Sequence, residues 1–248
     1  MEIRRVKKHD VDMTSGSVFR HLLNFAVPLL MGNIFQQLYN TVDTWVVGNY
    51  VSNEAFSAVG TVAPIINTLI GAFSGLASGA GVVISQYYGA GKYDRVKDAV
   101  HTAVMMTLVL SVVFTAIGIA MTPNMLRLMK TPAEVFPESR AYLNIYFSGM
   151  AGLMLYNMGA GILRAVGDSK RPFYYLVCAA VINTVLDLVF VIAFGMGVEG
   201  VAYATIIAQG ISAILTMLTL LRSESCVRVE LKLIRLHKDM LLKIIKVG

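Results

Sequence analysis

Charge is scarce in this sequence. Only 15% of the 248 residues are Asp, Glu, Lys or Arg, whereas 56% are hydrophobic. A soluble domain of this size needs a wet surface and therefore alternates apolar with polar positions. Here long stretches carry no charge at all, and windows of about 20 apolar residues have the length that crosses a bilayer core. The composition excludes a large soluble helical protein and indicates a membrane protein.

The residues and motifs of common active sites are also few. There are two cysteines, and because Cys178 lies in an apolar run and Cys226 in a basic segment, a disulfide framework is not expected. There is neither a Gly-rich Lys-Ser/Thr phosphate loop nor a nucleophile elbow, so no ATP site, cofactor or enzymatic activity is predicted. No metal site is expected from the scattered histidines, which are His9, His21, His101 and His237.

What is present is a series of long apolar segments. The first 17 residues are basic and have no apolar core, so the first hydrophobic segment is expected to be a mature span rather than a signal peptide. We predict an all-α membrane protein with a basic amino-terminal segment (1–17), a six-helix transmembrane lobe (18–221) and an amphipathic linker (222–248). The six predicted spans are 18–47, 55–86, 99–121, 137–163, 173–194 and 198–221.

The basic residues predict the orientation of these spans. With a cytoplasmic amino terminus, 18 of the 21 Lys and Arg residues fall on the cytoplasmic side, and only Arg127, Lys130 and Arg140 fall outside. This bias follows the positive-inside rule. We therefore interpret the net charge of +6 as a sign of membrane topology and not of a nucleic-acid partner.

Helix-breaking and small residues within the spans predict special packing. Pro28 lies inside the first span, where it removes one backbone hydrogen bond and predicts a helix kink. Pro28 is compatible with a helix that moves during function and equally with the prolines that are common in membrane helices. Gly71, Gly75 and Gly79 have a spacing of four, which predicts close approach by a neighbouring helix.

Two carboxylates lie well inside apolar runs, Asp43 in the first span and Asp187 in the fifth. An Asp near the bilayer centre costs about 2.5–3.5 kcal/mol, so such a residue indicates a functional site. The alternative is that each acid reaches water at a span end. At 1.5 Å per residue, Asp43, Asp187 and Thr205 are all expected roughly 8–11 Å below the outer surface. Asn183 precedes Asp187 by one helical turn and shares its face.

If these four side chains meet, the cluster has two possible ligands. A desolvated carboxyl group takes up a proton more readily, and two close carboxyl groups share one proton. Carboxylate, amide and hydroxyl oxygens also form a hard-ligand set that suits a cation such as Na⁺. The choice between H⁺ and Na⁺ stays open.

The order and spacing of several segments resemble the amino-terminal half of the multidrug and toxic-compound extrusion (MATE) family of antiporters. The similarity runs from about Gly16 to Leu221. It is carried by Pro28, the Thr41-Val42-Asp43-Thr44 segment, the Gly-Ala-Gly turn at 89–91, the segment from Gly161 to Asp168 followed by Pro172, and Asn183 with Asp187.

This resemblance implies two six-helix lobes that face each other in the plasma (inner) membrane, with substrate between them. It further implies efflux of amphipathic, often cationic, compounds by alternating access, driven by entry of H⁺ or Na⁺. The coupling cation would be bound by Asp43, Asn183, Asp187 and Thr205. The cavity of this lobe would be lined by Gln36, Tyr39, Tyr142 and Asn157, for which ordinary helix contacts are an equal alternative.

The sequence departs from the family in length, because it ends where the linker to a second lobe is expected. We therefore expect a truncated fragment or partial gene product that does not transport alone, unless two copies or a separate second half assemble around the cavity. Membrane lipids, an amphipathic substrate and a carboxy-terminal lobe are the expected partners. Two other functions stay open. A lipid or polysaccharide-precursor flippase would favour a strongly basic cavity, and the six spans lack intramembrane Arg or Lys. A non-transporting membrane scaffold would leave Asp43 and Asp187 exposed at span ends.

Overall fold

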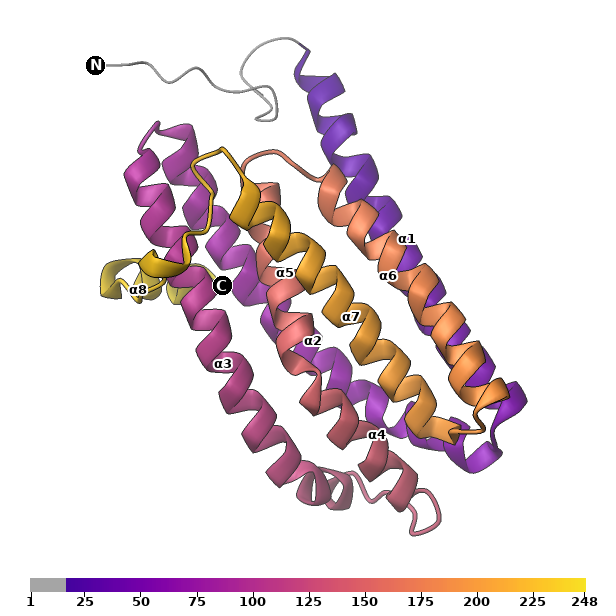
Figure 1. Cartoon of the computed structure of the whole chain (residues 1–248). Helices are drawn as coiled ribbons and strands as arrows, with labels where there is room; N and C mark the ends of the chain where they lie inside the picture. The colour runs from indigo at the N-terminus through magenta and orange to yellow at the C-terminus, as the bar shows by residue number, and fades with distance from the viewer. Residues whose placement is uncertain (1–16) are drawn as a thin grey trace.

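The computed structural model describes residues 17–248, and over this range it is built from helices alone (Figure 1). Its long helices run alongside one another as a bundle. The elements are α1 (Val18–Tyr50), α2 (Asn53–Gly89), α3 (Tyr93–Leu128), α4 (Phe136–Ser148), α5 (Met150–Ala165), α6 (Lys170–Leu188), a π-helical turn (Val189–Ala193), α7 (Gly197–Arg222), a 3₁₀ turn (Leu231–Leu233) and α8 (Lys238–Val247).

The six predicted spans correspond to these helices, with one correction. Span 137–163 is not a single helix, because the chain breaks at Gly149 into α4 and α5. Gly149 packs so closely on α7 that a Cβ atom there would clash with the side chain of Ile206. A glycine at this break therefore lets the two helices join where α7 crosses them.

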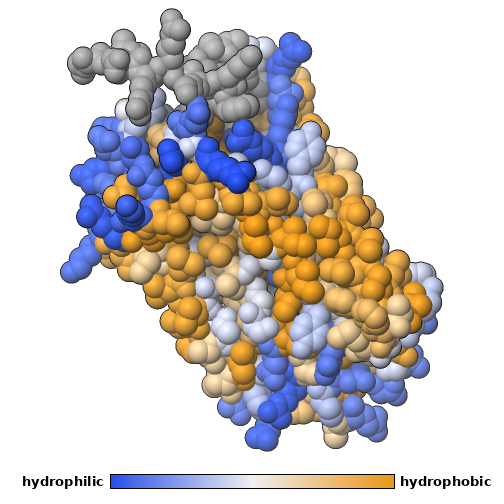
Figure 2. Space-filling model, viewed as in Figure 1, coloured by the Kyte–Doolittle hydropathy of each residue, from blue (hydrophilic) through white to orange (hydrophobic). Residues whose placement is uncertain are grey.

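Four of the helices are long and apolar enough to cross a membrane: α2, α3, α6 with its π-helical extension, and α7. α1, which corresponds to the first predicted span, is not among these four, and its second half contains Gln36, Gln37, Asn40 and Asp43. The fourth predicted span falls short in length because it is divided. On the face drawn in Figure 2, an apolar belt lies between two hydrophilic ends. Soluble monomers rarely expose so large an apolar surface, so the belt matches the surface that a bilayer covers.

The two ends of the bundle differ in charge. The end that we call the basic end carries the start of α1, the α2–α3 and α5–α6 turns and the end of α7 (Figure 1). Its two turns use Gly91 and Gly167, whose φ angles of 68° and 89° are left-handed and favour glycine. The opposite end carries the remaining turns. The predicted basic segment 1–17 lies outside the described residues except for Ser17.

Beyond α7 the chain folds back over the basic end, and we call residues 223–248 the strap. Its helix α8 packs against α2 and α3. Met240 and Ile244 face the bundle and are completely buried, whereas Ile245 and Leu236 are 55% and 43% exposed. Within α8, residues four apart face the bundle, whereas Leu236 precedes the helix.

The glycine row on α2 is explained in part by the strap. A Cβ atom at Gly79 would lie 2.7 Å from the carbonyl oxygen of Ile244 and 2.6 Å from the backbone nitrogen of Gly248. Gly75 lies close to the same end of α8. The predicted close helix approach is thus confirmed at Gly75 and Gly79, and the partner is α8. At Gly71 the predicted close approach is wrong for the described part of the chain, because no neighbouring atom lies within 4 Å of a Cβ atom placed on that residue.

Candidate functional site

The four polar side chains predicted to converge lie on three helices that pack together. Asp43 lies on α1, Asn183 and Asp187 on α6, and Thr205 on α7. Because α6 contacts both α1 and α7, one face of α6 meets both neighbours. Asn183 and Asp187 are four residues apart and so share that face. All four side chains are buried, with exposures of 6% or less.

The two carboxyl groups of this cluster face each other. Asp43 lies within interaction distance of the carboxyl group of Asp187 and of the hydroxyl group of Thr205. The Thr205 hydroxyl donates to the carbonyl oxygen of Val201 at 2.9 Å, so its oxygen lone pairs stay available to a cation or to another donor. The acids are therefore paired inside the bundle and do not lie at span ends.

Most polar atoms of this cluster have no hydrogen-bond partner among the described residues. They are Oδ1 of Asp43, both carboxyl oxygens of Asp187, and both Oδ1 and Nδ2 of Asn183. A buried polar atom without a partner costs about 1–3 kcal/mol, and more when it is charged. Such a set is stabilised by a proton shared between the acids, or by a cation held by the carboxyl, amide and hydroxyl oxygens. The donor set fits either ligand.

A cavity opens next to this cluster. It has a volume of about 780 Å³ and is lined from α1, α2, α4, α5 and α7. Asp43 and Thr205 reach its wall, together with the predicted lining residues Gln36, Tyr39 and Tyr142. Tyr39 and Tyr142 also lie within electrostatic range of Asp43. The buried acid pair therefore borders a space large enough for a small organic molecule.

Asn157, the fourth predicted lining residue, borders a second cavity. This cavity has a volume of about 300 Å³ and is lined from α1, α2, α5, α6 and α7. Gln36 and Tyr39 border both cavities, so the two spaces adjoin. The amide of Asn157 donates to the carbonyl oxygen of Leu153 at 2.8 Å, which leaves its side-chain oxygen for other partners.

Tyr146 and Gln209 are among the polar residues at these cavities that were not predicted from the sequence. Tyr146 is 3% exposed, lines the larger cavity and stacks on Tyr142 with 6.4 Å between ring centroids. Gln209 lines both cavities. Each lies four residues after a predicted site residue, Tyr142 or Thr205, and so occupies the same helix face one turn on. That spacing was the signal that could have found them.

The smaller cavity also holds residues whose sequence interpretation needs comment. Pro28 lines it from α1, which is a continuous helix from Val18 to Tyr50; the kink stays a prediction. Arg164, one residue beyond the fourth predicted span, lines the same cavity. Arg164 lies in the last turn of α5, outside the predicted span, so the prediction that the spans lack intramembrane Arg or Lys does not cover this position.

Comparison with known proteins agrees with this architecture. The MatE family model matches residues 28–189. The chain is 36% identical over 243 residues to the probable multidrug resistance protein YoeA of Bacillus subtilis, covering 94% of this chain and 52% of that protein. It is 34% identical over 201 residues to the probable multidrug resistance protein YpnP of the same organism, covering 81% of this chain and 45% of that protein. It thus spans about half the length of the curated relatives that it matches.

A solved structure shares the fold as well. The outward-facing conformation of a multidrug resistance MATE family transporter of the MOP superfamily superposes with a TM-score of 0.90 at 25% identity, over 98% of this chain and 53% of that one. The match extends over both cavities and the helices that carry the acid pair. On its sequence and its fold together, the chain is a half-length member of the MatE family of multi-pass membrane transport proteins.

Proposed function

We propose that this chain forms the amino-terminal lobe of a cation-coupled antiporter that exports amphipathic, often cationic, compounds. The observation that carries the proposal is the buried acid pair, Asp43 and Asp187, beside a cavity of about 780 Å³. Two ionisable groups inside a membrane domain are costly and mark ion pathways. The names of the relatives, probable multidrug resistance proteins, support efflux as the direction of transport.

In this proposal the coupling ion is H⁺ or Na⁺ and the four polar side chains hold it. Asp43 and Asp187 provide charge, and Asn183 and Thr205 provide neutral oxygens. Entry of the ion removes one net negative charge from the site. Such a change favours one of two arrangements of the helices that supply the ligands. Because the three helices α1, α6 and α7 meet here, ion binding is positioned to change how α1 lies against α6 and α7.

The substrate is proposed to occupy the space that Gln36, Tyr39, Tyr142 and Asn157 border, facing a second lobe. Tyrosine rings offer an apolar body and a polar tip, and rings near a cation attract it by their π face. The proximity of Tyr39 and Tyr142 to Asp43 supports competition between a cationic substrate and the coupling ion. Competition of this kind is sufficient for exchange of one for the other by alternating access.

In this proposal the lobe lies in the plasma membrane with its basic end facing the cytoplasm. The distribution of Lys and Arg supports this orientation. A carboxy-terminal lobe that completes the cavity is the required partner, and membrane lipids cover the apolar belt.

Neither alternative function is supported as well. A scaffold has no use for two acids buried against each other. A flippase for lipid or polysaccharide precursors favours a strongly basic cavity, and Arg164 is the one Lys or Arg among the described residues that border the two cavities.

The test uses a full-length transporter that carries this lobe followed by a second lobe, in inverted membrane vesicles. Accumulation of a fluorescent cation is followed under an imposed pH gradient and, separately, an imposed Na⁺ gradient. We expect Asp43→Asn and Asp187→Asn each to abolish gradient-driven transport while the protein is still inserted. Asp94→Asn, which removes an exposed acid from α3, is the matched control and should transport normally. Unchanged transport in both site variants would exclude the coupling role.

A further inference from the structure

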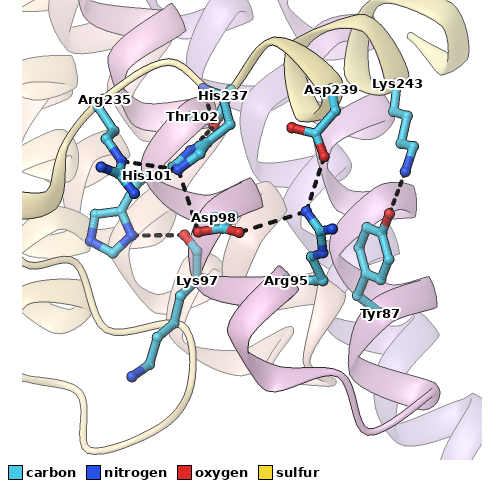
Figure 3. A network of polar contacts seen from close by, with 10 residues as sticks. All are labelled: Tyr87, Arg95, Lys97, Asp98, His101, Thr102, Arg235, His237, Asp239 and Lys243. Carbon is cyan, nitrogen blue, oxygen red and sulfur yellow. Dashed lines mark hydrogen bonds and ion pairs between the residues drawn. The ribbon is translucent and has the colours of Figure 1, made fainter.

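The strap is held to the basic end by a network of polar contacts that involves none of the transport residues (Figure 3). Arg95 on α3 binds the carboxylate of Asp239 on α8 at 3.0 Å. The ammonium group of Lys243 donates to the hydroxyl of Tyr87 on α2 at 2.6 Å. Two histidines, His101 on α3 and His237 at the start of α8, complete the network. Histidine is the side chain that changes charge between about pH 5 and 8.

His101 is fixed in one neutral form by its partners. Its Nδ1 lies 2.7 Å from the carbonyl oxygen of Lys97, which can only accept, so Nδ1 carries the proton. Its Nε2 then accepts from the backbone N–H of Glu230 at 3.0 Å. The ring is 2% exposed. A second proton would both charge a buried ring and break the bond to the strap, so His101 is a structural anchor.

His237 has conflicting partners. Its Nε2 lies 3.0 Å from Nε of Arg235, which can only donate, and 3.5 Å from a carboxylate oxygen of Asp98, which can only accept. The neutral ring with a free Nε2 satisfies Arg235. The protonated ring satisfies Asp98. The imidazole is 20% exposed and can therefore exchange protons with water.

The two partners also differ in where they lie. Arg235 belongs to the strap itself, two residues before His237, whereas Asp98 belongs to α3. The bond from Arg235 is thus internal to the strap. The ion pair with Asp98 links the strap to the bundle. Protonation exchanges the first for the second.

We propose that His237 and Asp98 form a second proton-binding site, on the basic end, whose occupancy tightens the attachment of the strap to α3. The bound ligand is a proton from the aqueous phase. The site is separate from the buried acid pair and does not depend on which ion drives transport.

The other charged groups around His237 leave Asp98 available to it. Arg95 lies 3.9 Å from Asp98 but is itself engaged by Asp239 at 3.0 Å, so Asp98 keeps a carboxylate oxygen for the imidazolium. The ammonium group of Lys97 points away from His237 (Figure 3). On the remaining side, Nδ1 of His237 lies 3.2 Å from the hydroxyl of Thr102, which accepts from Nδ1–H in either state of the ring. The added positive charge repels Arg235, which is exposed and free to turn into water.

The experiment measures amide hydrogen exchange of residues 230–248 in the whole chain, reconstituted in zwitterionic lipid nanodiscs at pH 6 and pH 8. Rates are corrected for the intrinsic effect of pH. For a partly exposed ion pair we expect about two- to fivefold more protection of α8 at pH 6. Asp98→Asn and His237→Gln should each remove this difference. Asp94→Asn, an acid one turn earlier on α3 for which the described residues offer no ion pair, should keep it.

His101→Gln separates a structural role from a proton-binding role. It should lower the protection of the strap at both pH values and preserve the ratio between them. Equal protection of the wild-type strap at pH 6 and pH 8 would overturn the proposal, and so would a ratio that survives His237→Gln.

Discussion

The close packing of the strap on α2 gives a sharp prediction about a single methyl group. In Gly79→Ala, the new Cβ would lie 2.7 Å from the Ile244 carbonyl oxygen and 2.7 Å from the α-carbon of Gly248. These are backbone atoms and cannot turn away. Since carbon atoms pack at about 3.5–4.0 Å, α8 must shift outward by roughly 1 Å.

The size of the effect follows from what α8 buries. Met240 and Ile244 are completely buried against α2 and α3, and a shift of the helix loosens both. Overpacking of this kind typically costs about 1–3 kcal/mol. That range corresponds to about a 5- to 150-fold larger population of the detached strap. Gly71→Ala adds the same methyl group to the same helix where nothing lies within 4 Å, and so it is the matched control.

Trypsin cleavage at Lys243 reports the detached state, because this residue lies within α8 and cleavage of a folded helix follows the population that opens. We expect faster cleavage in Gly79→Ala than in Gly71→Ala, by a factor in the range above. Equal cleavage of the two variants would refute the packing of α8 on α2.

Three other substitutions test the packing and the cavity. Gly118→Ala places a Cβ against the buried ring of Phe147 and is expected to destabilise the lobe by about 1–3 kcal/mol, seen as a lower thermal midpoint in detergent. Tyr175→Phe removes the hydroxyl that donates to Oγ1 of Thr219 at 2.6 Å and joins α6 to α7; the same assay should show a loss of about 1 kcal/mol. Gln209→Leu removes a polar group from both cavities and should weaken binding of an amphipathic cation to a two-lobed transporter by about two- to tenfold.

Each of these predictions has an outcome that contradicts it. For Gly118→Ala the comparison is Gly60→Ala, where nothing lies within 4 Å and where Ala should stabilise the helix slightly; identical midpoints would show that Phe147 yields freely. An unchanged midpoint in Tyr175→Phe would mean that the hydroxyl makes no net contribution. Full substrate affinity in Gln209→Leu would place the substrate elsewhere.

The helices could be predicted because their signal is local. An apolar stretch of bilayer length between turn residues determines a span without reference to the rest of the chain. Asp43 and Asp187 stood out for the same reason, since an acid in an apolar run is anomalous wherever it packs. Their similar depth in parallel helices then made a shared site predictable.

The features that the sequence did not determine are those that depend on which helices pack against each other. The break at Gly149 responds to the crossing of α7 at Ile206, and nothing near Gly149 in the sequence announces it. The partner of Gly79 lies about 165 residues further along the chain, in α8, so a glycine row predicts a close approach without naming what approaches. Tyr146 and Gln209 were missed because neither is unusual in a membrane helix. Only their positions one turn beyond Tyr142 and Thr205 place them at the cavities.

The central claim is that Asp43 and Asp187 act as one site, and ion uptake by the whole chain tests it most directly. Proton uptake or Na⁺ binding is measured by calorimetry on wild type, Asp43→Asn, Asp187→Asn and the double variant. Because members of one site are strongly coupled, we predict that each single variant loses the whole of the wild-type uptake and that the double variant loses no more. Independent losses that add up in the double variant would show two separate acids and contradict the claim.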